Sequence, residues 1–352
     1  MSNREKIKNI EFLRFVFTIL VVAFHMFATS YKLIYPSYAI CTQDGRLCVD
    51  FFFIISGFFL TLKFNETESV LDFVKKKIAR LQPVLIFSLA VYPRGDAVYT
   101  KIFSAIFCDN IGFTMQNGGN CWFVSVLFWA MLLYFYMIKY YRPQTVNLVV
   151  ALTVIFSYSF AIHVTNGRLV NDIRNYAYIF NTGMLRGLGG IGIGYFIANG
   201  YKYYQNKVSN KNMSIAKRIV TTIAEMYLFG WLVFNLCFHK LHFNNNIIFI
   251  VVFAFLFWMF LVRKGYFSKL LDNNFSAFLG KYSYSIFLMH MPVIHLYRLL
   301  ILNKHQDLMV NNHRVLNICI PIVFSVIAGM LTYHLVEIPG WKFLKKKLGI
   351  VP

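Results

Sequence analysis

The chain has 352 residues, of which 58% are hydrophobic and only 14% are charged. A soluble domain carries about 25% charged residues, so this chain cannot cover itself with a water-compatible surface. Soluble, disordered and fibrous classes are therefore excluded, and a polytopic membrane protein is indicated. The formal net charge of +21 raises the question of where the basic residues lie relative to the membrane.

Runs of about 17–25 mainly apolar residues can cross a bilayer as helices. Ten runs predict an all-α integral membrane protein, a single domain over 1–352 built as a bundle of about ten transmembrane helices. The runs are 11–30, 47–63, 82–93, 121–138, 146–163, 177–198, 219–238, 247–262, 278–301 and 316–337. The connections leave no room for a soluble domain. Residues 64–80 predict an amphipathic helix on the membrane surface.

The basic residues follow the positive-inside rule when the N-terminus is placed inside. The inner connections then hold 22 Lys and Arg residues, and the outer connections hold 9. This asymmetry predicts that both termini are cytoplasmic. Because the basic bias records topology, the sequence does not favour a nucleic-acid partner.

Two polar residues of the first run point to chemistry at membrane depth, where such residues are costly and usually functional. Arg14 and His25 are eleven residues apart, which is close to three helical turns, so they share one face of the helix. They lie about 16 Å apart along the axis, with Arg14 near the cytoplasm and His25 in the outer half. The alternative is that Arg14 only pairs with Glu11, and that His25 only bonds a neighbouring helix.

The spacing of Arg14 and His25 resembles the first-helix signature of the acyltransferase 3 family of multi-pass membrane acyltransferases. Five further segments resemble the family's motifs in the same order. They are VDFFFIISGFFL (49–60), KKKIARLQPVLIF (75–87), CWFVSVLFWAMLLYF (121–135), LGKYSYSIFLMHMPV (279–293) and HLVEIPGWKFLKKK (334–347). The resemblance covers nearly the whole chain, as a stand-alone membrane domain. Leu127 stands near the place where many members have a glutamate.

The resemblance implies transfer of an acyl group, commonly acetyl, from cytoplasmic acyl-CoA to a hydroxyl of an extracytoplasmic glycan. His25 is then the general base and Arg14 a second catalytic residue on the donor's route. Lys77 and Arg80 are expected to bind the donor's phosphates, and Glu337 to brace Arg14 or the basic segment. Acyl-CoA is a co-substrate, and no bound cofactor is expected. The resemblance places the chain in a bacterial cytoplasmic (inner) membrane, with surface polysaccharide or lipid-linked glycan as acceptor.

Three other polar residues are possible supporting groups. Asp50 opens the second run at a depth comparable with His25, so it either orients the imidazole or is an exposed helix-start carboxylate. Tyr284 and His290 match the family's segment, and packing or interhelical hydrogen bonds explain them equally well. Arg186 precedes a glycine-rich stretch that predicts close helix contact.

A transporter or flippase is the alternative function, with Arg14, His25, Arg186 and Glu225 on a substrate or proton path. Such folds show inverted repeats and paired broken helices, and the sequence shows neither.

The cysteines and histidines lack metal-site spacing, so no metal is expected. Disulfides in the two outer loops, Cys41 with Cys48 and Cys108 with Cys121, remain an open alternative.

Overall fold

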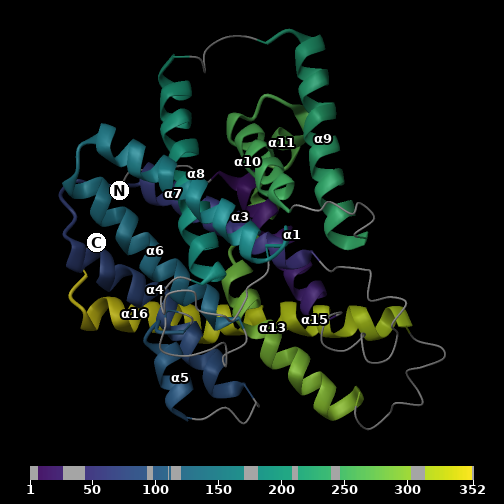
Figure 1. Ribbon diagram of the computed structural model, residues 1–352. Coiled ribbons are helices and arrows are strands. Elements are labelled where there is room, and N and C mark those ends of the chain that lie inside the picture. Colours follow the sequence, from purple (N-terminus) through teal and green to yellow (C-terminus); the bar gives the residue numbers. More distant parts are fainter. Residues whose placement is uncertain are drawn as a thin grey trace.

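The computed structural model describes residues 7–26, 44–92, 98–109, 111, 120–169, 181–207, 213–238, 246–302 and 314–350. Within these ranges the chain is built from helices (Figure 1). The elements are α1 (Lys8–Met26), η3 (Gly45–Leu47), α3 (Cys48–Leu62), α4 (Val70–Val91), α5 (Val98–Ala105), α6 (Cys121–Tyr140), α7 (Pro143–Val164), α8 (Thr182–Lys207), α9 (Ile215–Phe238), α10 (Ile247–Val262), α11 (Tyr266–Leu270), α12 (Asn274–Gly280), α13 (Ser283–Tyr297), η4 (Arg298–Leu302), α15 (Arg314–Thr332), η5 (Tyr333–Glu337) and α16 (Ile338–Lys347).

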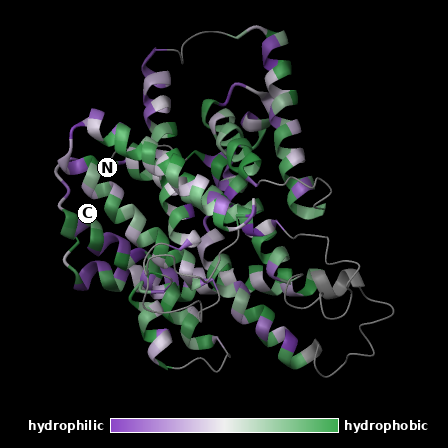
Figure 2. Cartoon of the chain, viewed as in Figure 1, coloured by the Kyte–Doolittle hydropathy of each residue, from purple (hydrophilic) through white to green (hydrophobic). Residues whose placement is uncertain are grey.

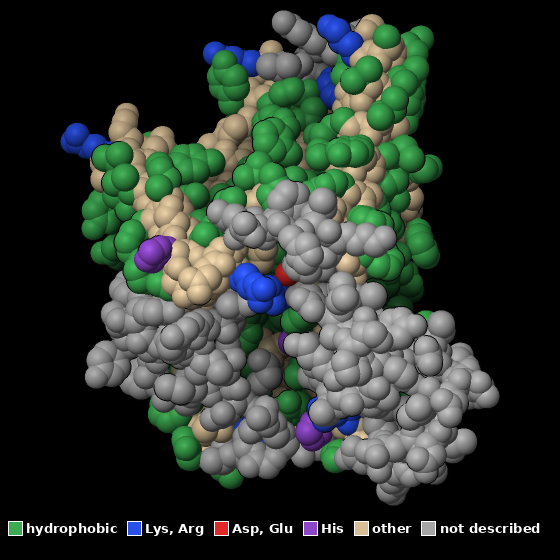
Figure 3. Space-filling view, turned by 45° about the vertical axis from the view of Figure 1, so that its right-hand side comes forward, with side chains coloured by type: hydrophobic (Ala, Val, Ile, Leu, Met, Phe, Trp, Pro, Cys, Tyr) green, Lys and Arg blue, Asp and Glu red, His purple; other side chains and the backbone are tan. Residues whose placement is uncertain are grey.

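Six helical segments of the described ranges are long and apolar enough to cross a membrane. They are α1, Gly45–Leu62, α6, α7, α9 and Cys319–Lys347, and the shorter α10 is also apolar. Hydrophobic residues accordingly dominate the helices in Figure 2, and hydrophobic side chains cover much of the described surface in Figure 3. The chain is therefore an all-helical, multi-pass membrane protein. The count of ten spans is not confirmed, and the cytoplasmic placement of the termini stays a prediction.

The predicted surface helix at 64–80 and the predicted span at 82–93 are joined in one helix, α4. Ser69 begins this helix by accepting a hydrogen bond from the backbone N–H of Asp72, as an N-cap does. Pro83 lies inside the helix without ending it. Gly340 of α16 lies against the Pro83 ring, at a place where a Cβ atom would overlap the proline. The two helices can therefore pack closely at this point.

Helices α3 and α8 form the tightest packing in the core. A Cβ atom at Gly57 would overlap the carbonyl oxygen of Ile191, and one at Gly194 would overlap the carbonyl oxygen of Ile54. Small residues let helix backbones approach in this way. The glycine-rich stretch therefore serves the close helix contact that the sequence predicts.

Helix α1 lies at the centre of the arrangement and contacts α3, α10, α12, α13 and α15. In Figure 1 the yellow C-terminal helices, α15 and α16, run almost end to end along one side of the bundle and are joined by the π-helical turn η5. α13 packs against α15 and also against α1. These contacts bring three segments of the candidate site together, although they lie far apart in the sequence.

Candidate active site

On the predicted cytoplasmic side, the candidate site begins with an ion pair on α1. Arg14 Nη1 donates to both carboxylate oxygens of Glu11, at 3.0 and 2.8 Å. The two residues are one turn apart, which is the spacing at which helical ion pairs form. The pairing with Glu11 is thus present, and it leaves the remaining nitrogens of the guanidinium for another partner.

Glu337 connects this part of the site to η5, the C-terminal π-helical turn. The Glu337 carboxylate is buried and accepts a 2.6 Å hydrogen bond from the hydroxyl of Ser285. The positive charges of Arg80 and Arg14 both act on it. The expectation that Glu337 braces Arg14 or the basic segment stays a prediction, and its position near both charges is compatible with it. Sequence reasoning did not single out Ser285, although it directly follows Tyr284.

Tyr284 ties α13 to α4. Its hydroxyl donates a 2.7 Å hydrogen bond to the backbone oxygen of Leu81. Leu81 directly follows Arg80, so this bond fixes α4 beside the segment that carries Glu337. The role of Tyr284 visible in the structure is to hold two helices together.

The basic face of α4 offers two different cations. Arg80 is exposed, whereas Lys77 is half-buried with its Nζ 5.1 Å from the centroid of the Phe73 ring. Burial, assisted by the charge of Arg80, lowers the pKa of the Lys77 ammonium to about 7. Lys76 instead pairs with Glu68 at 2.7 Å. Arg80 is therefore accessible to a ligand, while Lys77 loses its charge near neutral pH.

On the predicted outer side, the candidate site contains a pair of histidines. The rings of His25 on α1 and His290 on α13 lie 5.1 Å apart between centroids, with an interplanar angle of 38°. His290 is fully buried, and its Nδ1 lies 2.5 Å from the backbone oxygen of Phe287. A carbonyl oxygen only accepts, so Nδ1 carries the proton and Nε2 of a neutral ring has the lone pair. That Nε2 atom has no hydrogen-bond partner within the described ranges.

Asn120, directly before α6, supports the histidine pair. Its Nδ2 donates to the same Phe287 oxygen and lies 3.5 Å from His290 Nδ1. The sequence analysis missed this residue. The sequence shows that Asn120 directly precedes the Trp-led helix, but it does not indicate that the amide reaches α13.

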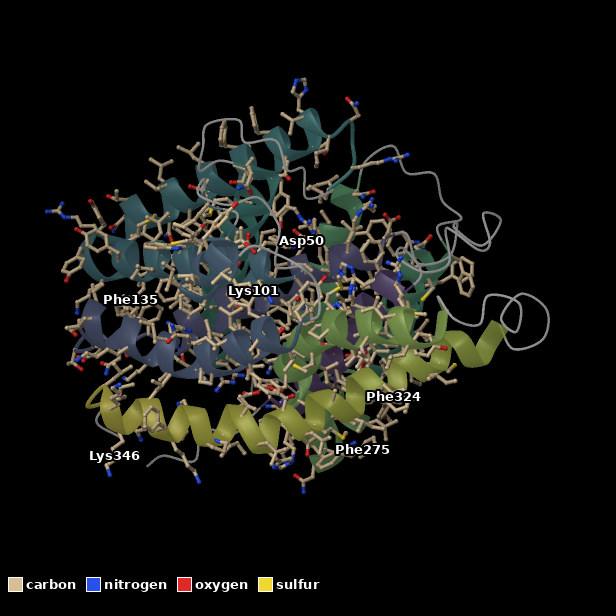
Figure 4. The ribbon with its side chains drawn as sticks, turned by 90° about the horizontal axis from the view of Figure 1, so that it is seen from below. Asp50, Lys101, Phe135, Phe275, Phe324 and Lys346 are labelled. Atoms are coloured by element: carbon tan, nitrogen blue, oxygen red, sulfur yellow. The ribbon has the colours of Figure 1, made fainter. Side chains whose placement is uncertain are left out.

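Asp50 departs from both interpretations made from the sequence. It is fully buried and lies among the helices in Figure 4. Its Oδ2 accepts from Arg186 Nη2 at 2.6 Å and its Oδ1 from the hydroxyl of Tyr158 at 3.3 Å. Asp50 is therefore neither exposed nor bonded to His25. The guanidinium of Arg186 also lies 5.9 Å from the centroid of the Trp122 ring.

Metal and disulfide sites have little support in the part of the chain that the structure describes. No group of three His, Cys, Asp or Glu side chains there is arranged to hold a metal ion. Cys48 is buried at the start of α3, and Cys41 lies outside the described residues, so the Cys41–Cys48 pairing is not assessed.

Comparison with protein families identifies the family of the chain. Residues 7–334 match the acyltransferase 3 model, described as an acyltransferase domain. No curated protein and no solved structure matches the sequence.

Proposed function

The chain belongs to the acyltransferase 3 family, and from this premise we propose that it is a membrane O-acyltransferase. The donor is cytoplasmic acyl-CoA, with acetyl-CoA as the first choice. The acceptor is a hydroxyl of a glycan on the other side of a bacterial cytoplasmic membrane. Acyl-CoA is consumed as a co-substrate, and the proposal involves no nucleic acid.

The observation that carries the proposal is the His25–His290 pair. Buried polar groups normally find hydrogen-bond partners, yet His290 Nε2 has none within the described ranges. The neighbouring His25 ring lies on the same helix face as Arg14, about 16 Å further along the axis. An imidazole lone pair kept inside an apolar bundle is suited to accept a proton from a substrate.

The residues on the predicted cytoplasmic side support the proposal that acyl-CoA is the donor. Acyl-CoA carries several phosphate charges, and exposed Arg80 can bind phosphate through two parallel hydrogen bonds. Arg14 has guanidinium nitrogens beyond the one that binds Glu11. The charges of Arg80 and Arg14 both act on Glu337, so we place the donor's route between the basic face of α4 and α1. The acyl end of the donor would follow this route towards His25.

The proposed reaction is direct acyl transfer with His25 as general base. His25 takes the proton of the acceptor hydroxyl while the hydroxyl oxygen attacks the thioester carbonyl. The new C–O ester bond forms and the C–S bond breaks, and the proton held by His25 passes to the departing CoA sulfur. His290, fixed by Phe287 and Asn120, packs against the His25 ring and limits its orientation.

The transporter alternative requires Arg186 and Glu225 to face a common path with Arg14 and His25. Arg186 is bound to Asp50. Glu225 is buried and accepts hydrogen bonds from the backbone N–H and the hydroxyl of Ser268, at 2.9 and 2.7 Å. Both residues therefore serve helix-to-helix contacts, which favours the acyltransferase.

The deciding experiment measures hydrolysis of acetyl-CoA by the purified protein. An acyltransferase predicts slow release of CoA that is lost in His25→Ala, whereas a transporter predicts no release in either protein. Mass spectrometry of surface glycans from cells with and without the protein then identifies the acyl group and the acceptor. Absence of both CoA release and a lost acyl mass would refute the proposal.

A further inference from the structure

A groove opens towards the lipid between α7, α8 and α10. It has a volume of about 500 Å³ and an almost entirely apolar lining, which includes Val154, Ile193, Ile250 and Ala254. The lining residues of α7 belong to its second half and those of α10 to its first half. By the predicted topology, the groove therefore lies in the outer leaflet. Its dimensions suit hydrocarbon, and a water-soluble ligand would gain little from it.

Tyr158 connects the groove to a charged cluster. The Tyr158 side chain lines the groove, and its hydroxyl donates to Asp50, which holds Arg186. Arg186 also donates to the backbone oxygen of Arg46 at 3.0 Å. The inner wall of the groove thus continues directly into a set of arginines.

The rim of the groove carries another arginine. The backbone N–H of Asn246, just before α10, donates to the oxygen of Gly167 at 2.9 Å, so the outer ends of α7 and α10 are tied together. Arg168 follows Gly167 and is exposed. Its charge, like that of Arg186, acts on Arg46, which places the three guanidiniums in one region.

Arg46 is incompletely paired. Its Nη2 donates to Asp44 at 3.0 Å, but its buried Nε has no hydrogen-bond partner among the residues that the structure describes. The cluster of Arg46, Arg168 and Arg186 faces two carboxylates, Asp44 and Asp50. It therefore keeps an excess of positive charge and an available donor, which is the chemistry that recognises phosphate.

The cluster also adjoins the histidine pair. Gly45, next to Arg46, lies so close to α1 that a Cβ atom there would be 2.6 Å from the Cβ of Phe24. The Phe24 ring is 4.9 Å from the His25 ring. A ligand held by Arg46 would therefore present its neighbouring groups to the region of His25.

We propose that the groove and the arginine cluster bind the acceptor as a lipid-linked glycan. The hydrocarbon anchor lies in the groove, the linking phosphate binds Arg46 and Arg168, and the sugar hydroxyl is directed towards His25. This inference rests on the proposed acyltransferase function and selects its acceptor class. A polysaccharide without a lipid anchor would use neither the apolar groove nor its basic rim.

The test measures binding of a labelled polyprenyl phosphate to the full-length protein in phosphatidylcholine nanodiscs. Arg168→Gln and Arg46→Gln should each weaken binding about tenfold, because each removes a charge-assisted hydrogen bond. Arg142→Gln, at the other end of α7, is the matched control and should have no effect. Ala254→Trp should fill the groove and abolish binding, whereas Leu152→Trp, on the exposed face of α7 outside the groove lining, should not.

Competition distinguishes the lipid-linked ligand from other sources of phosphate. Inorganic phosphate and phosphatidylglycerol should compete poorly because they lack the polyprenyl anchor, and the polyprenyl alcohol because it lacks the phosphate. Equal competition by phosphatidylglycerol would show a general lipid site and overturn the inference, as would binding that is insensitive to both arginines. CoA release lost in His25→Ala together with such insensitivity would leave the acyltransferase proposal standing. Arginine-dependent binding without CoA release would support the lipid-binding site and contradict the acyltransferase proposal.

Discussion

The His25 ring on α1 and the His290 ring on α13 pack 5.1 Å apart, although 265 positions separate them in the sequence. The Nδ1 proton of His290 is committed to the Phe287 carbonyl, so its lone pair lies on Nε2. One member of the pair therefore has a defined tautomer, and the other shares a helix face with Arg14. This arrangement makes the two histidines distinguishable by mutation.

His25→Ala should lower kcat by about 10²–10⁴ with little change in the KM for acyl-CoA, because it removes a general base and not a donor contact. In the wild type, kcat should fall as the pH is lowered, since a protonated imidazole cannot accept the hydroxyl proton. Steady-state kinetics of CoA release across pH checks both expectations. A folded His25→Ala protein with near-normal kcat would exclude this base and leave His290 as the candidate.

Local contacts of the site could be predicted from the sequence, and distant ones could not. The Arg14–Glu11 pair follows from helical spacing, and the glycine-rich stretch of α8 correctly predicts close helix contact. The partner of Asp50 could not be found in this way. Arg186 lies 136 positions away, and only the packing of α3 on α8 brings the two charges together. Similarly, the sequence predicts a surface helix at 64–80 and a separate span at 82–93, whereas the two are joined in the continuous helix α4, with Pro83 inside it.

Arg80→Ala should raise the KM for acyl-CoA several-fold and leave kcat nearly unchanged, because it removes ground-state attraction for phosphate. Arg80→Lys separates two mechanisms. It restores most of the affinity if charge alone matters, and little if two parallel hydrogen bonds are needed. The matched control is Lys76→Ala, since Lys76 is already paired with Glu68. A KM equal to that of the wild type in both Arg80 variants would mean that Arg80 contributes only to membrane orientation through the positive-inside rule.

Donor binding should also depend on pH through Lys77. Burial lowers the pKa of this ammonium to about 7, so the group is charged below that pH and becomes neutral above it. The KM for acyl-CoA should therefore rise as the pH increases from about 6 to about 8. Lys77→Arg, which stays charged throughout, should remove this dependence. If the KM of wild type and Lys77→Arg follows the same pH profile, Lys77 does not bind the donor.

The predicted topology can be tested by introducing single cysteines and labelling them with a membrane-impermeant reagent in intact cells. Positions Lys76 and Lys346 should react only after the membrane is opened, because the positive-inside rule places both in the cytoplasm. Positions Asn117 and Lys304 should react in intact cells. Labelling of position 76 from outside would invert the orientation and the proposed donor side with it.

The Asp50–Arg186 pair should determine stability more than catalysis. Both side chains are buried, at 0% and 1% exposure, and removing one partner leaves an uncompensated charge in a dry environment. Asp50→Asn is therefore expected to destabilise the protein by about 3–5 kcal/mol, measured as a loss of thermal stability in detergent. Replacing both residues, as in Asp50→Leu with Arg186→Met, should recover most of that loss because no buried charge remains. If Asp50 instead oriented His25, Asp50→Asn would lower kcat while leaving the unfolding temperature unchanged, and the double variant would be as inactive as the single one. The contact of Asp50 with Arg186 and Tyr158 favours the first outcome.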